Sequence, residues 1–483
     1  MNKSLIVVSC LRMLMIGTVH ASTSEWWKNT ATGGVDNDIN NVVNWASALT
    51  TSDTARFNNN SGNKIPVLNS NMTLSSIMIL GSDYNISSVN DAAFTIEGTG
   101  TTTSVYGLGI TGADVIFSAN LVLGTGGVQS IYSSKNTIVS GNISGNATLL
   151  LRIGGTLTLS GSNSYMGETR YVGASAVLLN IGSANALSTG NLVWTTGGQL
   201  DNTTGSALIL ANHVDLSNDM VFVGSDNLTV GSLDLGSSTA GANRNITIND
   251  QTLTVTESAV SSGNTARILN KYGGGALIIK GDATSTGKVS AATGTLIIDG
   301  NVVGAVDIAD GAKFGAGSVA GLVTTKAVGS TIIVGGDEVG STTFSANFDV
   351  RLGAIFDMQL GDAVSDELTV EGKLRMNADT LLAFNLLDAG DFSDGVYDLL
   401  TLNGLYGGSG ELTDAKLSTY DLSNITLNYD TNQWKLDTSY GTDGILFDTS
   451  GLSVSFLVIP EPATWLLLGL GAATLTVYRW RRR

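Results

Sequence analysis

Strand-length runs of alternating apolar and polar residues fill the middle of the chain and limit what it can fold into. Between Thr73 and Leu452, apolar residues mostly alternate with Thr, Ser, Asn or Asp, and the runs end at Gly or Asn-Gly-like turns. A period of two residues directs successive side chains to opposite faces of a strand, whereas a helix needs a period near 3.6. No long stretch between the termini has the helical period. The sequence therefore predicts an all-β body, and its sixty glycines suit many tight turns.

An internal repeat extends this prediction to a solenoid. Residues 154–161, Gly-Gly-Thr-Leu-Thr-Leu-Ser-Gly, recur at 274–281 as Gly-Gly-Ala-Leu-Ile-Ile-Lys-Gly, and each copy continues into further strand-and-turn segments. Regularly spaced short strands with glycine at the corners are what stacked coils require. One side of every strand would then pack into a shared core.

These units resemble the autotransporter-associated β-strand repeat of bacterial passenger domains and other exported proteins. The similarity is best at residues 155–161 with Asn163, Tyr165 and Gly167, and is also good at residues 294–317. The resemblance implies a right-handed parallel β-helix in which loops carry any binding. An array of Gly- and Thr-rich β-sandwiches is the alternative.

The C-terminus has three parts in order: Pro460-Glu461-Pro462, an apolar run over 463–478, and a basic end. The two prolines fix φ and keep their segment extended. The run is 16 residues long, a little shorter than the roughly 20 of a comfortable transmembrane helix. The basic end would stay in the cytoplasm by the positive-inside rule; it consists of Arg479, Arg481, Arg482 and Arg483 around Trp480.

This arrangement resembles the PEP-CTERM sorting signal. The resemblance implies that exosortase, an integral-membrane cysteine transpeptidase of Gram-negative bacteria that make exopolysaccharide, processes the chain at the Pro-Glu-Pro box. A plain C-terminal membrane anchor is the alternative interpretation.

The N-terminus predicts export. Residues 1–21 have a lysine near the start, an apolar stretch and a small-x-small end, which is typical of a secretory signal cleaved between Ala21 and Ser22. A lipoprotein box at Cys10 is the alternative, but the apolar run before it is too short. Because Cys10 is the only cysteine, the mature protein is expected to have no disulfide, no catalytic thiol and no cysteine-ligated metal.

The charge of the exported body excludes one class of partner. The full chain has a net charge of −17. Without the six basic residues of the two processed ends and Glu461, 18 basic and 40 acidic residues remain, a balance of about −22. Such a body is not expected to bind nucleic acid through phosphate contacts.

The sequence divides into five predicted parts. They are a signal peptide (1–21), an N-terminal β cap region (22–140), a repeat solenoid (141–325), a C-terminal β region (326–455) and the sorting signal (456–483).

Aromatic residues gather in the predicted N-terminal cap. Trp26, Trp27 and Trp45 are bulky enough to cover the core of a first coil that has no preceding neighbour. An aromatic platform for stacking sugars is the alternative.

Few residues are suited to catalysis. His20 leaves with the signal, and His213, beside Asn212, is predicted to be a turn or surface residue. One histidine cannot build a multi-histidine metal site, and no Gly-x-Ser-x-Gly elbow surrounds a serine.

A polysaccharide lyase would need clustered carboxylates and a basic proton acceptor. Asp362, Asp366 and Glu367, with Lys373 or Arg375, are the candidates. Their spacing alternates across strand faces, so the sequence predicts a solvated surface there. No catalytic, cofactor or metal site is therefore predicted.

The expected protein is a non-enzymatic surface or matrix component, adhesin-like or structural, that starts as an inner-membrane precursor and ends at the cell surface or outside the cell. Its expected partners are exosortase and, through the C-terminal helix, the membrane; exopolysaccharide is a further candidate. The alternative is a polysaccharide-active β-helix enzyme. A true autotransporter is not expected, because such proteins end in a barrel of amphipathic strands.

Overall fold

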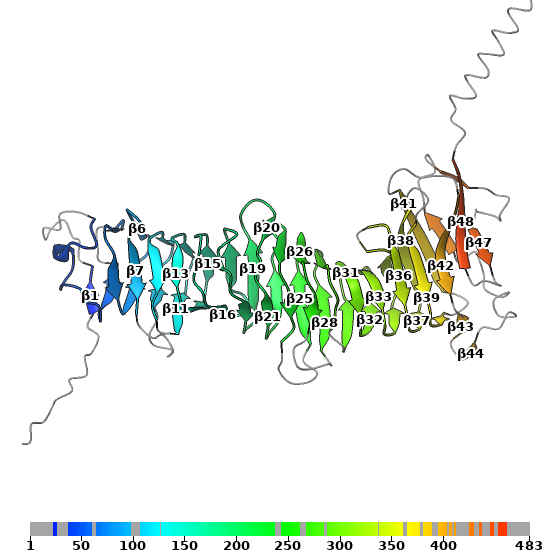
Figure 1. The fold of residues 1–483 in the computed structure, drawn as a ribbon, viewed down its shortest axis with the longest axis horizontal. Coiled ribbons are helices and arrows are strands. Elements are labelled where there is room, and N and C mark those ends of the chain that lie inside the picture. Colours follow the sequence, from blue (N-terminus) through cyan, green and yellow to red (C-terminus); the bar gives the residue numbers. More distant parts are fainter. Residues whose placement is uncertain are drawn as a thin grey trace, which may run out of the picture.

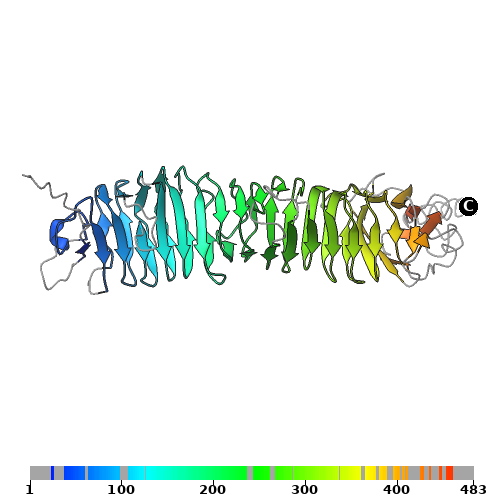
Figure 2. The ribbon, with the colours of Figure 1, turned by 90° about the horizontal axis from the view of Figure 1, so that it is seen from below.

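The chain winds into an elongated β-solenoid, seen from the side in Figure 1 and from below in Figure 2. The computed structural model describes residues 23–26, 37–59, 64–97, 107–125, 127–236, 243–260, 267–284, 287–336, 338–360, 365–376, 380–388, 395–402, 405–407, 410–411, 425–428, 434–436, 445–448 and 453–460. In these residues the only helix is the short 3₁₀ segment η1 (Val42–Asn44). The all-β class and the parallel solenoid are thus confirmed, and the right hand of the coil stays a prediction.

The coils contribute strands to three faces, and along each face strands of successive coils pair in parallel, with one interruption on face 3. Face 1 consists of β1 (Thr23–Glu25), β2 (Thr54–Phe57), β5 (Ser76–Ile79), β8 (Leu108–Ile110), β11 (Val128–Ser133), β14 (Thr148–Ile153), β16 (Thr169–Gly173), β18 (Leu192–Trp194), β21 (Val214–Leu216), β24 (Leu233–Asp234), β27 (Ala259–Val260), β36 (Ser341–Phe344), β39 (Glu367–Val370) and β42 (Gly395–Leu402).

Face 2 is the most continuous stack. It consists of β3 (Val67–Leu68), β6 (Asn85–Ser88), β9 (Val115–Phe117), β12 (Thr137–Val139), β15 (Thr156–Leu159), β17 (Leu178–Ile181), β19 (Gly198–Asn202), β22 (Met220–Phe222), β25 (Arg244–Ile248), β28 (Ile268–Tyr272), β30 (Lys288–Ala291), β32 (Ala305–Ile308), β34 (Val323–Thr325), β37 (Phe348–Val350), β40 (Leu374–Arg375) and β43 (Leu405–Gly407).

Face 3 is interrupted between residues 146 and 207, where its side of the coil is built by turns. Its strands are β4 (Met72–Leu74), β7 (Ala93–Ile96), β10 (Asn120–Leu123) and β13 (Ile143–Gly145), then β20 (Leu208–Ile209), β23 (Leu228–Val230), β26 (Thr252–Val255), β29 (Ala276–Ile279), β31 (Thr295–Val302), β33 (Lys313–Val319), β35 (Thr331–Ile333), β38 (Gly353–Leu360), β41 (Leu381–Asp388) and β45 (Ile425–Asn428). The long strands β31 and β33 turn the corner, and their C-terminal ends join face 1.

The alternating pattern places one row of side chains inside the coil. In β15, Leu157 and Leu159 are fully buried while Thr156 and Thr158 face outward. The in-register pairing stacks Leu157 on Leu179 of the next coil. Burying each such leucine contributes about 1.5–3 kcal/mol, so the core is an axial column of apolar residues rather than a single central cluster.

Close backbone approach requires glycine at some corners. Gly145 has φ of 109°, and a Cβ there would lie 2.1 Å from the Leu123 carbonyl oxygen of the preceding coil. No L-residue side chain fits that position without moving the backbone.

The two sequence copies occupy different faces of the coil. The strand of the first copy is β15, on face 2, whereas the strand of the second copy is β29, on face 3. All three faces impose the same demands, namely an alternating strand followed by a glycine corner, so a similarity over eight residues does not specify a face. The solenoid fits a protein built of β-strand repeats, but the two similar segments do not occupy equivalent positions in it.

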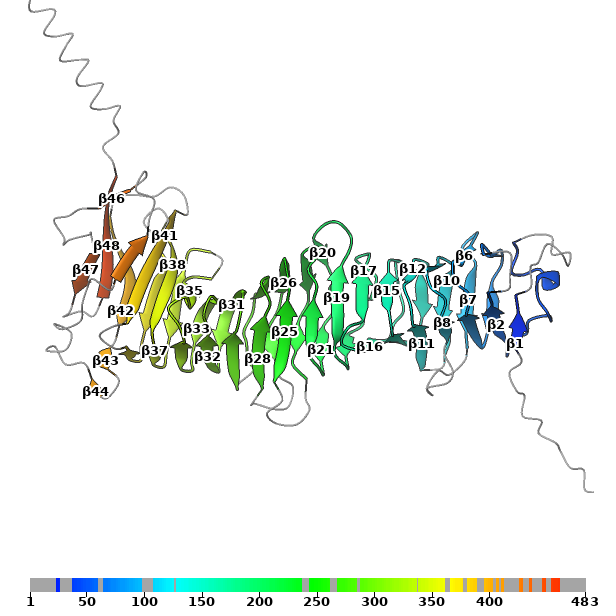
Figure 3. The ribbon, with the colours of Figure 1, turned by 180° about the vertical axis from the view of Figure 1, so that it is seen from behind.

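The predicted part boundaries do not coincide with breaks in the stacking. β11 pairs with β14 across residue 140, and β34 pairs with β37 beyond residue 325. Among the described strands, antiparallel strand pairs are those of the C-terminal end, which Figure 3 shows from behind; isolated antiparallel bridges also join Trp26 to Trp45 and Leu360 to Ser365. The strands of this end are β44 (Gly410–Glu411), β46 (Trp434–Leu436), β47 (Ile445–Asp448) and β48 (Ser453–Pro460).

Candidate functional site

One of the lyase-type candidates, Asp366, has a structural role. Asp366 was predicted to lie on a solvated surface, but its side chain is fully buried. One carboxylate oxygen accepts the N–H of Gly340 at 2.7 Å and the other accepts the N–H of Gln359 at 2.6 Å. The prediction was wrong because the segment before Gly340 folds over this position, which the strand pattern does not show. Burial raises the pKa of Asp366 to about 6, although the two N–H bonds act in the opposite direction.

The other lyase-type candidates lie on separate faces. Glu367 begins β39 on face 1, and its carboxylate accepts a hydrogen bond from the Thr401 hydroxyl at 2.9 Å. Arg375 is on face 2, where it forms an ion pair with Asp349 at 3.2 Å. Asp362 lies outside the described residues. Among the described candidates, Asp366, Glu367 and Arg375 do not meet at one point.

His213 has a local partner rather than a catalytic one. It lies immediately before β21, is partly buried, and its Nδ1 is 2.6 Å from the Ser232 hydroxyl of the next coil. Among the residues that the structure describes, no three His, Asp or Glu side chains are grouped so that they could hold a metal ion.

The aromatic residues of the first coil form a core cap. Trp26 and Trp45 are only 2% and 6% exposed, and their rings meet edge to face with centroids 5.1 Å apart. Phe57 and Tyr84 continue the cluster into the next coil. These two tryptophans are therefore not available as a sugar-stacking platform, and Trp27 lies outside the described residues.

A polar row runs along the outside of face 2 in its C-terminal half. Side chains link neighbouring coils there. The Asn270 amide donates a hydrogen bond to the Asn245 side-chain oxygen at 2.9 Å, and Asp307 forms ion pairs with Lys288 and Lys326. Burial raises the pKa of Asp307, but the two ammonium groups outweigh that effect and hold the pKa below its ordinary value. In register, the row consists of Asn245, Asn270, Ser290, Asp307, Thr324, Asp349 and Arg375.

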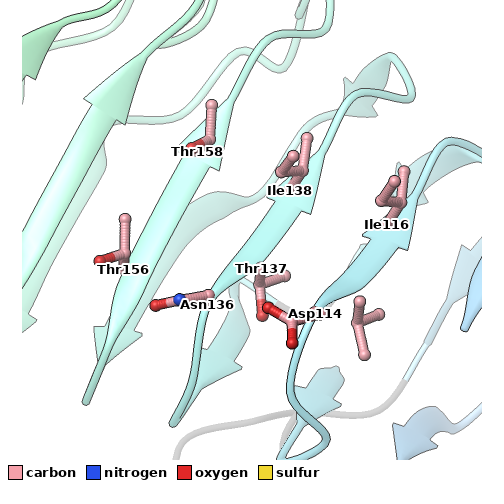
Figure 4. A pocket seen from close by; sticks show the side chains of 8 residues that line it. Asp114, Ile116, Asn136, Thr137, Ile138, Thr156 and Thr158 are labelled. Atoms are coloured by element: carbon pink, nitrogen blue, oxygen red, sulfur yellow. The ribbon is translucent and has the colours of Figure 1, made fainter. Parts of the chain in front are cut away.

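A shallow groove lies on the N-terminal half of the same face. Figure 4 shows its side chains on the neighbouring strands β9, β12 and β15. Ile116 and Ile138, 37% and 40% exposed, continue in register into Thr158 and form one row of the groove. The groove has a volume of about 350 Å³. Its second row of side chains is polar and consists of Asp114, Asn136 and Thr156.

The sequence contained a signal for this groove. In Val115-Ile116-Phe117, three apolar residues follow one another, and Ile138 and Val139 are likewise adjacent. When the flanking residues face the core, the central isoleucine must face outward. A narrow ligand chain would match the groove if its apolar side contacted the isoleucine row and its hydrogen-bonding groups faced the polar row.

The C-terminal strand leads directly into the tail. β48 ends at Pro460, and residues 461–483 lie outside the described residues, as do the predicted signal peptide 1–21 and the predicted cleavage pair Ala21 and Ser22. No helix in the described part of the chain is long and apolar enough to cross a membrane, and the predicted span 463–478 is not part of it.

Comparison with known families identifies the tail. Residues 458–483 match the model of the PEP-CTERM protein-sorting motif, so the sorting signal predicted from Pro460, Glu461 and Pro462 is confirmed. The matched range includes the terminal arginines. No curated protein matches the chain. The motif indicates an exported, membrane-processed protein that reaches the cell surface, and the chain therefore combines a PEP-CTERM sorting motif with a parallel β-solenoid.

Proposed function

We propose that this protein is a non-enzymatic surface or extracellular-matrix component, sorted by an exosortase-type enzyme in an exopolysaccharide-producing Gram-negative bacterium. The observation that carries the proposal is the position of the sorting motif, directly at the end of an elongated parallel solenoid. Before processing, the apolar run 463–478 holds the precursor in the inner membrane with its arginines in the cytoplasm. After processing, the solenoid is carried into the exported product.

A structural role is favoured because the residues best suited to catalysis already serve the fold. Both oxygens of Asp366 accept backbone N–H groups, Arg375 is paired with Asp349, and His213 contacts Ser232. Using them as acid, base or nucleophile would break those contacts. The polysaccharide-active enzyme remains the alternative, and a polysaccharide-depolymerisation assay on the purified protein tests it: turnover would contradict the proposal.

The proposed ligand surface is the groove on face 2, and its proposed ligand is a neutral polysaccharide. A sugar ring offers an apolar face to Ile116 and Ile138 and hydroxyl groups to Asp114 and Asn136. The net charge of the body, about −22, disfavours polyanions. Since the described groove has no aromatic ring, each sugar would bind weakly, and affinity would come from many copies in the matrix.

The sorting step is tested by intact mass. The wild type and the triple variant Pro460→Ala/Glu461→Ala/Pro462→Ala are recovered from envelope and medium fractions of cells that contain the processing enzyme. The expected result is loss of roughly 20 to 25 C-terminal residues in the wild type only, which corresponds to the chain from the Pro-Glu-Pro box to the C-terminus. An uncut C-terminus in both proteins would leave a plain membrane anchor.

The groove is tested by affinity electrophoresis in gels containing a neutral polysaccharide or a polyuronate. Retardation by the neutral polymer is expected for the wild type and should be lost in Ile116→Asp/Ile138→Asp. Ile209→Asp is the matched control, because Ile209 is 69% exposed on face 3, away from the groove. Equal retardation of the groove variant, or retardation by the polyuronate alone, would contradict this assignment.

A further inference from the structure

The last strand of the fold is paired on both of its edges. β48 runs antiparallel to β42 on one edge, with Gly395 opposite Val458. Its other edge pairs with β47 over residues 453–456 and with β46 over residues 458–460. Figure 3 shows β46 and β47 beside β48 at the end of the solenoid. Residues 453–456 and Val458 are thus paired on both edges, whereas Ile459 and Pro460 have a described partner only in β46.

The sorting motif begins inside this paired strand. The match to the motif starts at Val458, whereas β48 extends to Pro460. In register, Ile459 lies opposite Lys435 and Pro460 lies opposite Trp434. No linker separates the folded body from the Pro-Glu-Pro box, since the first proline of the box is the last residue of the strand.

A peptidase binds its substrate as an extended chain whose backbone groups are free to pair with the enzyme. Pairing with β46 occupies one edge of residues 458–460, so the strand cannot enter a cleft in that state. The obstacle is small, because only three residues are paired with β46 and Pro460 has no N–H to donate. Short terminal pairings of this kind open locally at low cost.

We infer that β46 and β48 form a latch over the sorting motif, and that the processing enzyme acts on molecules in which residues 458–460 have separated from β46. This inference rests on the proposed sorting function. The fraction of open molecules multiplies the cleavage rate, as for any binding-competent minor state. Completion of the solenoid end thereby slows processing, and an incompletely folded end is processed faster.

Insertion of a flexible Gly-Ser linker between Ile459 and Pro460 tests the latch. The linker keeps the Pro-Glu-Pro box intact but moves it away from β46. Pulse–chase with intact-mass detection, in cells that contain the processing enzyme, should show cleavage about five- to thirtyfold faster, the effect of removing one or two backbone hydrogen bonds. The matched control is the same linker between Gly451 and Leu452, which adds length between β47 and β48 and should leave the rate unchanged.

Lys435→Pro supplies an independent variant, since proline disfavours the β46 pairing without changing the motif. It should also be cleaved faster. Unchanged or slower cleavage of the linker variant overturns the latch, as does equal acceleration by the control linker. Cleavage that persists in Pro460→Ala/Glu461→Ala/Pro462→Ala would instead overturn the proposed sorting function, so the two failures are distinguishable.

Discussion

Asp366→Asn measures what a buried carboxylate contributes when each of its oxygens holds a different segment. The wild-type oxygens accept the N–H groups of Gly340 at 2.7 Å and Gln359 at 2.6 Å. An amide has a single oxygen, so its NH₂ group must face the second N–H. A buried donor left without an acceptor costs about 1–3 kcal/mol. This is the expected loss of local stability at pH 4, where the wild-type carboxyl group is largely neutral.

The stability difference between the wild type and Asp366→Asn should become smaller as the pH rises. Burial raises the pKa of Asp366 from 3.8 to about 6 in the folded chain. Between these values the folded chain binds more protons than the unfolded chain, so wild-type stability falls as the pH rises and is level above pH 6. At 1.36 kcal/mol for each tenfold change in proton affinity, the fall is at most about 3 kcal/mol. Asparagine does not titrate, so the stability of the variant does not decrease with pH through this group.

Hydrogen exchange of the Gly340 and Gln359 amides, corrected for intrinsic exchange rates at each pH, is the appropriate assay because it reports local opening in a long solenoid. Asp366→Asn should lower the protection of one or both amides, more at pH 4 than at pH 7. Asp357→Asn is a control, since Asp357 is a carboxylate on β38, the strand of Gln359, but pairs with Lys313. A deficit that grows between pH 4 and pH 7 would refute the reasoning.

Three further changes probe the coil. Lys271→Met removes an ammonium group that donates to three backbone carbonyls, and it should lower the free energy of urea unfolding by about 2–4 kcal/mol. Burial lowers the pKa of Lys271 to about 8, so the folded chain binds fewer protons than the unfolded chain between pH 8 and 10.5. Over this range the wild type should therefore gain stability and the variant should not. Trp45→Ala opens the N-terminal aromatic cap, costs about 3–5 kcal/mol, and should move the first site of limited proteolysis into the N-terminal coils. Gly145→Ala should cost at least about 2 kcal/mol in thermal unfolding, whereas Gly154→Ala, with its nearest atom 3.4 Å from the new Cβ, should be close to neutral; equal effects would contradict the close-approach argument.

Local pattern was enough to predict the class of fold but not the position of each strand around the coil. Alternation in segments such as Thr156–Leu159 predicted strands with one buried side, and this is how β15 lies. The same alternation suits any of the three faces, which explains why the strands at 156–159 and 276–279 could look equivalent and yet occupy different faces.

The site was less predictable, because burial of polar groups depends on segments that are distant in the sequence. The spacing around Asp366 indicated solvent exposure, but in the fold the chain near Gly340 and the strand of Gln359 pack against it. Lys271 gave no sequence signal at all, since its carbonyl partners include Thr293 of the following coil. The sorting motif, by contrast, is a linear signal, so Pro460 and its neighbours could be identified without any knowledge of the fold.

The length of the solenoid is set by its number of coils. Its coils stack along one axis, with β1 at one end and β48 at the other (Figure 1). At a strand spacing of about 4.8 Å, the stack from β3 to β43 extends on the order of 70 Å. Each coil contacts only its neighbours, so losing or duplicating one coil would change this reach by a single strand spacing and leave both ends intact. The number of coils thus sets how far the aromatic N-terminal end stands from any surface that holds the chain at residue 460.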